Sequence, residues 1–321
     1  MKQTTINKEF RLTGLGLHTG RTVTVTVRPA PPDSGIAFRR TDRFNILTQP
    51  ALATAVSETS RGTTLGGGRH SIATVEHLMS ALHGCGVDNA LIELDGGEVP
   101  ILDGSARPWV LQLNRVGVHE QEAERKVFHF SESLHFENKD TGSIYDVKPA
   151  DTFSVECVID FSKSVIGRQC AVLEDLSHYE SEVAPCRTFV FLHEIEPLLH
   201  LNLIKGGSLD NALVYVDKEL GHRQLRRLER TFHKDASQFR VHDGVLNTTE
   251  PYFPNEPARH KLLDFMGDIR LTGVLLCGHF SIYKPGHKAN VSFGKYLINY
   301  IKENSQMDQS PKSESLFCSE N

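Results

Sequence analysis

Polar and apolar residues alternate along Arg21–Val27, which reads RTVTVTV, and this alternation predicts a strand with one buried face. Residues 89–95, NALIELD, also have the pattern of a strand. Between them, residues 71–84 carry apolar side chains at positions 75, 78, 79 and 82, which is the spacing of one face of a helix. We expect this helix to stop at Gly84 and residues 108–116 to form another short helix.

Strand and helix patterns also mix in the second half of the chain. Strand patterns occur at 127–136, 143–147, 153–161, 211–217 and 274–283. One helical pattern begins near Ala258, and a second covers residues 288–302. The polar segment HEQEAER, residues 119–125, is expected to link two domains, which cover residues 1–122 and 126–302.

Two segments of the second half depart from regular patterns. The apolar stretch at 189–207 is rich in loop signals. A charged insertion runs from Lys218 to about Pro257 and contains a helix-like piece, RQLRRLERTF, and a turn-rich piece, NTTEPYFPNEP. Residues 303–321 are polar and rich in serine, and we expect them to be a disordered tail or linker.

Composition narrows the class of protein. With 39% apolar and 23% charged residues, the 321-residue chain is typical of a soluble globular protein with a buried core. The net charge of −5 argues against a general nucleic-acid binder, which needs a basic surface. The sequence shows no secretory signal and no apolar run of about 18 residues, and its six cysteines are scattered. We therefore expect a cytoplasmic protein with reduced thiols and no membrane span.

Three polar residues fall on one line of the helix predicted to begin near Ala258. His260, Asp264 and Asp268 recur every four residues, roughly opposite an apolar stripe. A histidine and a carboxylate one helical turn apart can bind the same cation. The alternative is a solvated helix face, and the spacing alone does not decide between them.

The helix predicted at 71–84 offers a similar choice. Glu76 and His77 point away from its apolar stripe, and they form either an exposed dipeptide or a third metal ligand, His77, beside a carboxylate base. Catalytic zinc commonly has three protein ligands and one open position. Two histidines and one aspartate, His77, His260 and Asp264, would suit a hydrolytic zinc site.

Two further histidines are candidates. His287 follows a Pro-Gly turn and opens the last predicted helix, where it is either a surface residue or a general acid that Asp268 could orient. His18 lies in the glycine-rich segment GLGLHTG, and it is either a structural loop histidine or a substrate-binding residue.

Seven motifs then make the chain recognisable. In chain order they are GLGLHTG followed by RPAP, TVEHLMSALHG, EVPILDGSARPW, APCRTFVF, GGSLDNALVYVD, ARHKLLDFMGD and YKPGH. Together, from about residue 3 to residue 302, they closely resemble the UDP-3-O-acyl-N-acetylglucosamine deacetylases, the zinc enzymes of lipid A synthesis in Gram-negative bacteria. The resemblance implies an α+β fold of two similar domains, each a layered β-sheet with helices packed on it, and an active site at the domain interface.

The resemblance also implies the roles of the candidate residues. One Zn²⁺ ion per chain would be held by His77, His260 and Asp264, a ligand set that also accepts Fe²⁺. Glu76 would be the general base and His287 the general acid. Asp268 would orient His287, and Thr188, in APCRTFVF, would help to hold the oxyanion.

Substrate contacts follow from the same resemblance. Lys261 and Lys284 correspond to residues that contact the sugar nucleotide, and Lys148 to one near the uridine diphosphate. An insert at 189–210 corresponds to an apolar passage for the acyl chain, and the residues in question are Phe189, Ile195, Leu198, Leu201, Ile204 and Gly207. The alternative for each of these apolar residues is an ordinary place in the core.

The implied reaction is zinc-dependent hydrolysis of the 2-N-acetyl group of UDP-3-O-(3-hydroxyacyl)-N-acetylglucosamine, which gives a free amine and acetate. The alternatives are a different zinc amidohydrolase and a sugar-nucleotide-binding protein without catalysis; the H-E-x-x-H motif of many zinc peptidases is absent from the sequence. The long insertion at 218–257 resembles the variant fused to a 3-hydroxyacyl-carrier-protein dehydratase. We therefore expect either a stand-alone enzyme or a piece of a bifunctional one.

Overall fold

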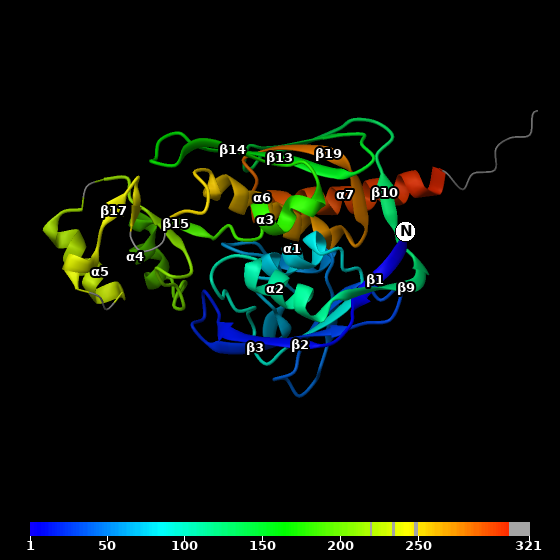
Figure 1. Cartoon of the computed structure of the whole chain (residues 1–321), viewed down its shortest axis with the longest axis horizontal. Helices are drawn as coiled ribbons and strands as arrows, with labels where there is room; N and C mark the ends of the chain where they lie inside the picture. Colours follow the sequence, from blue (N-terminus) through cyan, green and yellow to red (C-terminus); the bar gives the residue numbers. More distant parts are fainter. Residues whose placement is uncertain (219, 233–234, 247–249, 308–321) are drawn as a thin grey trace, which may run out of the picture.

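The computed structural model describes residues 1–218, 220–232, 235–246 and 250–307. The structure is mixed α+β, as expected. Figure 1 shows two β-sheets on opposite sides of the molecule, with helices lying between them. In the described part of the chain, no helix is both long enough and apolar enough to cross a bilayer.

The first sheet holds five strands in the order β2-β3-β8-β4-β5. Their bounds are β2 Phe10–Leu15, β3 Thr22–Pro29, β4 Ile36–Arg40, β5 Thr48–Pro50 and β8 Ala90–Leu94. Strand β3 confirms the predicted alternation, because Val23, Val25 and Val27 are buried while the neighbouring threonines are less so. Only the β4–β8 pair is parallel in this sheet.

The second sheet repeats that order as β11-β12-β19-β13-β14, and β10 adds to β19. The bounds are β10 Val127–His129, β11 Leu134–Asn138, β12 Ser143–Lys148, β13 Phe153–Phe161, β14 Gly167–Leu173 and β19 Leu275–Tyr283. In each sheet the strand that comes last in the sequence lies in the middle of the order. It is β8 in the first sheet and β19 in the second, and it pairs in parallel with β4 and with β13, respectively. The two sheets therefore share one topology.

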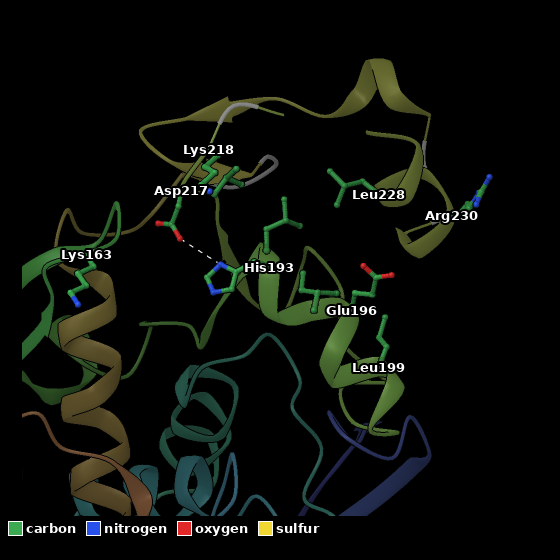
Figure 2. A pocket seen from close by; sticks show the side chains of 11 residues that line it. Lys163, His193, Glu196, Leu199, Asp217, Lys218, Leu228 and Arg230 are labelled. Carbon is green, nitrogen blue, oxygen red and sulfur yellow. Dashed lines mark ion pairs between the residues drawn. The ribbon is translucent and has the colours of Figure 1, made fainter. Parts of the chain in front are cut away.

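Smaller elements surround the sheets. β1 Lys2–Ile6 pairs with β9 Val118–Glu124, and β6 Val56–Glu58 pairs with β7 Thr64–Leu65. A separate four-stranded sheet has the order β15-β16-β18-β17, with β15 Phe189–Phe191, β16 Leu213–Tyr215, β17 Val241–His242 and β18 Val245–Leu246. Beside it, α4 Leu192–His200 and α5 His222–Phe232 contribute to the wall of a cavity of about 870 Å³ (Figure 2).

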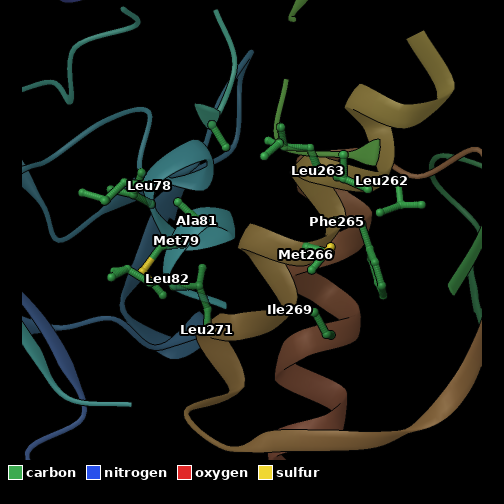
Figure 3. Close-up of a cluster of buried hydrophobic side chains, with 14 of the residues drawn as sticks. Leu78, Met79, Ala81, Leu82, Leu262, Leu263, Phe265, Met266, Ile269 and Leu271 are labelled. Atoms are coloured by element: carbon green, nitrogen blue, oxygen red, sulfur yellow. The ribbon is translucent and has the colours of Figure 1, made fainter. Parts of the chain in front are cut away.

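The helices between the two main sheets share the core with the buried faces of those sheets. They are α1 Glu76–Gly84, α2 Arg107–Val116, α3 Tyr179–Glu182, α6 Glu256–Ile269 and α7 His287–Met307. Figure 3 shows apolar side chains of α1 and α6, among them Leu78, Met79, Phe265 and Met266, and all four are fully buried. Helices α1 and α6 pack directly against each other, so side chains far apart in sequence are brought together.

Several elements differ from the secondary structure predicted from the sequence. The predicted linker at 119–125 lies mostly in β9, because it pairs with the N-terminal strand. The stretch at 127–136 is split between two strands, and the loop-rich stretch at 189–207 contains β15 and α4. Residues 303–307 continue helix α7 rather than a disordered tail, while the rest of that predicted tail, 308–321, lies outside the described residues. The predicted helix at 71–84 begins only at Glu76.

The close approach of α1 and α6 depends on Gly267. A Cβ atom at this position would lie 2.0 Å from the backbone oxygen of Glu76. We expect Gly267→Ala to lower the free energy of unfolding by about 1–3 kcal/mol, because the clash outweighs the better helix propensity of alanine. Urea unfolding measures this change. Gly67→Ala is the control, since a Cβ at Gly67 meets no atom within 4 Å, and an equal loss in both variants would contradict the prediction.

Candidate metal and catalytic site

Helices α1 and α6 bring together two histidines and an aspartate. His77 lies on α1, and His260 and Asp264 lie one turn apart on α6. One ligand atom from each residue lies within 4.8 Å of the others. The Asp264 Oδ1 atom is 3.4 Å from His260 Nε2 and 3.7 Å from His77 Nε2. All three residues are buried, so the alternatives of an exposed dipeptide and a solvated helix face are wrong.

The chemistry of these three side chains fits a divalent cation. Asp264 Oδ1 is buried and has no hydrogen-bond partner, which is costly for a carboxylate oxygen unless a cation faces it. His260 Nδ1 donates to the Cys186 carbonyl at 3.0 Å, which leaves Nε2 directed at the other two residues. Burial and the neighbouring His260 lower the pKa of His77 to about 3, so its imidazole is neutral, as a metal ligand must be.

Glu76 lies beside this group and is itself 3% exposed. Its Oε2 atom accepts a hydrogen bond from the Thr63 backbone N–H at 2.9 Å. Burial raises the pKa of Glu76 to about 7. A carboxylate with a pKa near neutrality is well suited to take a proton and release it again.

His287, at the start of α7, completes the polar centre. Its Nε2 atom is 3.8 Å from Asp264 Oδ2 and 4.0 Å from Glu76 Oε1, and its Nδ1 atom donates to Asp268 Oδ2 at 3.0 Å. Burial would lower the pKa of His287, but the carboxylates of Asp268, Asp264 and Glu76 raise it to about 9. The imidazole is therefore protonated at neutral pH and able to donate a proton through Nε2.

The lysines expected near the substrate are placed differently. Lys261 Nζ is 2.7 Å from Asp264 Oδ2 and lies 5.6 Å from the centre of the Phe189 ring, so it borders the centre. Lys284 has a positive φ of 52° and an ion pair with Asp160, and it stands three residues before His287. Lys148 is exposed at the last position of β12, where this strand pairs with His279 of β19. Lys284 directly follows β19, at the other end of the β12–β19 pair.

Most of the predicted acyl-passage residues line one cavity. Those found in its wall are Phe189, Ile195, Leu198, Ile204 and Gly207, and two other candidates, His18 and Thr188, also line it. Leu201 is not among the lining residues, and 69% of it is exposed. Phe189 joins the cavity to the polar centre, because its ring centre lies 6.4 Å from that of His260.

Comparison with known proteins agrees with this geometry. The sequence pattern of one family, described as UDP-3-O-acyl N-acetylglycosamine deacetylase, matches residues 3–235 and 237–299. The chain belongs to this deacetylase family. A bifunctional LpxC/FabZ enzyme of Bacteroides thetaiotaomicron is 41% identical over 94% of this chain and 65% of its own length.

Family members named UDP-3-O-acyl-N-acetylglucosamine deacetylase are similarly close. That of Myxococcus xanthus is 40% identical over 90% of this chain and 83% of its own length. That of Saccharophagus degradans is 39% identical over 94% of this chain and 91% of its own length. The chain spans about 65% of the length of the bifunctional relatives that it matches.

This member of the deacetylase family also has the larger cavity of Figure 2, which α4 lines as well. Ile195 and Leu199 line both cavities. The apolar side of the larger cavity includes Val216 and Leu228, and its rim carries an ion pair between His193 and Asp217. From the described part of the insertion at 218–257, Leu228 of α5 packs in one buried cluster with Ile195 of α4 and Val216.

Three buried residues of the polar centre were missed by sequence analysis. Thr63 Oγ1 donates to Asp268 Oδ1 at 2.5 Å, and Asn290 Nδ2 donates to Asp268 Oδ2 at 2.9 Å. Tyr145 donates to Asn290 at 2.6 Å. Asn290 lies three residues after His287 on the same helix, so helical spacing could have indicated it. Thr63 and Tyr145 carry no such signal, because they lie far away in sequence.

Proposed function

We propose that this chain is a zinc-dependent deacetylase that removes the 2-N-acetyl group of a UDP-3-O-(3-hydroxyacyl)-N-acetylglucosamine. Support comes from one arrangement above all: a buried set of His77, His260 and Asp264, flanked by Glu76 and by the His287–Asp268 pair. Membership of the deacetylase family supports the same assignment. Because the bifunctional relatives are longer than this chain, the activity of the whole protein is part of the proposal.

The mechanism follows from what each side chain is able to do. His77, His260 and Asp264 would hold a zinc ion, which would supply Lewis acidity toward water and the acetamide carbonyl. Glu76 accepts a proton from the attacking water, whose oxygen forms a bond to the acetyl carbon. Thr188 donates a hydrogen bond to the carbonyl oxygen as negative charge develops there. His287, oriented by Asp268, gives its Nε2 proton to the sugar nitrogen as the C–N bond breaks, and acetate leaves.

The proposal extends to the organisation of the chain and its substrate contacts. Residues 1–122 and 126–302 form two domains, and each supplies one of the ligand-bearing helices α1 and α6. Lys261 and Lys284 contact the sugar nucleotide, while His18 and the cavity residues of the 189–210 insert hold the acyl chain. Lys148 is exposed at the end of β12 that lies away from Lys284. It contacts the uridine diphosphate, which extends along this strand.

Zinc content measured together with acetate release tests the assignment. We expect about one equivalent of Zn²⁺ per purified chain, release of acetate from the acylated sugar nucleotide, and loss of activity on chelation that added Zn²⁺ restores. Zinc without acetate release would favour a different metal-dependent hydrolase. Binding of the sugar nucleotide without zinc would favour a binding protein that does not catalyse the reaction.

The acyl chain is expected to contribute strongly to turnover. Each methylene buried in the cavity contributes about 0.8 kcal/mol, so four of them correspond to about 3 kcal/mol, or about 100-fold in kcat/KM. UDP-N-acetylglucosamine without the acyl chain should therefore be a poor substrate. Leu198→Ala, in the cavity wall, should weaken the preference, whereas Leu201→Ala, which is not in the wall, should leave it unchanged. Equal turnover of both substrates by the wild type would contradict this prediction.

A further inference from the structure

Thr63 lies just before β7, on the loop that connects β6 to β7, and it is fully buried. Each of its polar groups has a partner on another element. Its N–H donates to Glu76 Oε2 at 2.9 Å, and its carbonyl accepts a hydrogen bond from the N–H of Val75 at 3.2 Å. Its hydroxyl donates to Asp268 Oδ1 at 2.5 Å. One residue is thus bonded both to the start of α1 and to the polar side of α6.

The hydroxyl of Thr63 has a distinct place on the Asp268 carboxylate. Asn290 and His287 both donate to Oδ2, at 2.9 and 3.0 Å, whereas Thr63 donates to Oδ1. A carboxylate held at both oxygens has a fixed plane, and this plane determines the direction of the His287 ring. The Thr63 hydroxyl is also 3.3 Å from His287 Nδ1, so it lies against the same ring.

We propose that Thr63 is a positioning residue that sets Glu76 against the His287–Asp268 pair. The inference rests on the proposed function, in which Glu76 takes a proton and His287 gives one. Glu76 Oε1 and His287 Nε2 are 4.0 Å apart, and the water and the sugar nitrogen must be accommodated beside both atoms. A small change in either side chain would disturb two proton transfers, and reactions of this kind are sensitive to displacements of less than 1 Å.

Thr63→Val tests the inference because valine keeps the shape and the backbone N–H but lacks the hydroxyl. For the zinc-loaded protein acting on the acylated sugar nucleotide, we expect kcat to fall about 10- to 100-fold, with KM nearly unchanged. Zinc content and melting temperature should stay close to those of the control variant. Thr63→Ser, which restores the hydroxyl, should recover most of the lost kcat.

The matched control is Thr5→Val. Thr5 is also buried, and its hydroxyl donates to the Asn89 carbonyl at 2.7 Å, away from the polar centre. The Thr5 hydroxyl also accepts a hydrogen bond from the Ala30 N–H at 3.1 Å, so Thr5→Val removes two hydrogen bonds of a buried hydroxyl without touching Asp268. A second comparison uses Asp268→Asn: if Thr63 acts through Asp268, adding Thr63→Val to Asp268→Asn should lower kcat much less than it does in the wild type.

The outcomes separate the inference from the proposed function. A kcat for Thr63→Val within about twofold of that for Thr5→Val, or additive effects in the double variant, would overturn the role of Thr63 while leaving the deacetylase assignment intact. Wild-type protein that released no acetate would overturn the proposed function, and the inference with it. If Thr63→Val does not fold, Thr63→Ser and Thr63→Cys replace it, because they are nearly equal in size and differ in donor strength; equal kcat values would then refute the inference.

Discussion

Replacing Glu76 with glutamine is expected to lower kcat by about 10²- to 10⁴-fold while the purified protein keeps its zinc. Glutamine has the shape of glutamate, and its amide oxygen can still accept the Thr63 N–H, so the side chain should stay in place. It cannot take a proton from water, however. Initial rates of acetate release, combined with zinc content determined on the same preparation, measure both parts of the prediction.

Glu93→Gln is the matched control for this change. Glu93 is a partly buried carboxylate on β8 whose partners are Arg28 and Arg39, and it has no contact with the candidate site. Its replacement should leave kcat nearly unchanged. If Glu76→Gln lost zinc along with its activity, Glu76 would belong to the ligand set, and its assignment as the base would have to be given up.

Removing the buried Arg187 side chain, which pairs with Glu256 at the start of α6, is expected to have the largest effect on the free energy of unfolding. Arg187 Nε lies 2.9 Å from Glu256 Oε1, and the glutamate is fully buried. Glu256 also accepts hydrogen bonds from the backbone N–H groups of Arg187 and Tyr252. Arg187→Met would leave a buried carboxylate without its counter-ion, which costs about 3–5 kcal/mol. Urea unfolding should show this as a lower midpoint with a similar slope.

Two comparisons make the stability prediction specific. Adding Glu256→Gln to Arg187→Met should recover part of the loss, since no charge then remains unpaired. Lys288→Met removes one partner of an exposed ion pair with Asp140, and it should change the free energy of unfolding by at most about 1 kcal/mol. Similar losses for Lys288→Met and Arg187→Met would show that burial of the pair has little influence.

The apolar side of each ligand helix was predictable, and its polar side was not. The apolar spacing of the helix predicted at 71–84 identified Val75, which directly precedes α1, and Leu78, Met79 and Leu82 on α1, and all four are fully buried. The same analysis left Glu76 and His77 either exposed or functional, because a helical wheel describes one helix in isolation. Their burial results from the packing of α6 against the other side of α1, which is a property of the tertiary structure.

Strand order had a similar limit. Alternation marked β3, β12 and β13 individually, but it contains no information about partners, and the parallel pairs β4–β8 and β13–β19 join strands that are distant in sequence. The polar strand β9 was interpreted as a linker because its side chains are mostly exposed, while its backbone hydrogen bonds to β1 leave no trace in composition. Motifs located the chemistry better than periodicity located the elements that carry it.

The shared topology of the two main sheets has a consequence for how the metal assembles with the protein. Helix α1 precedes the central strand of one sheet and α6 that of the other, yet His77 is on α1 while His260 and Asp264 are on α6. A chain severed between residues 124 and 126 would leave each fragment with an incomplete coordination set. Tight cation uptake would then require the fragments to reassociate, so the metal would act as a reporter of complementation between them.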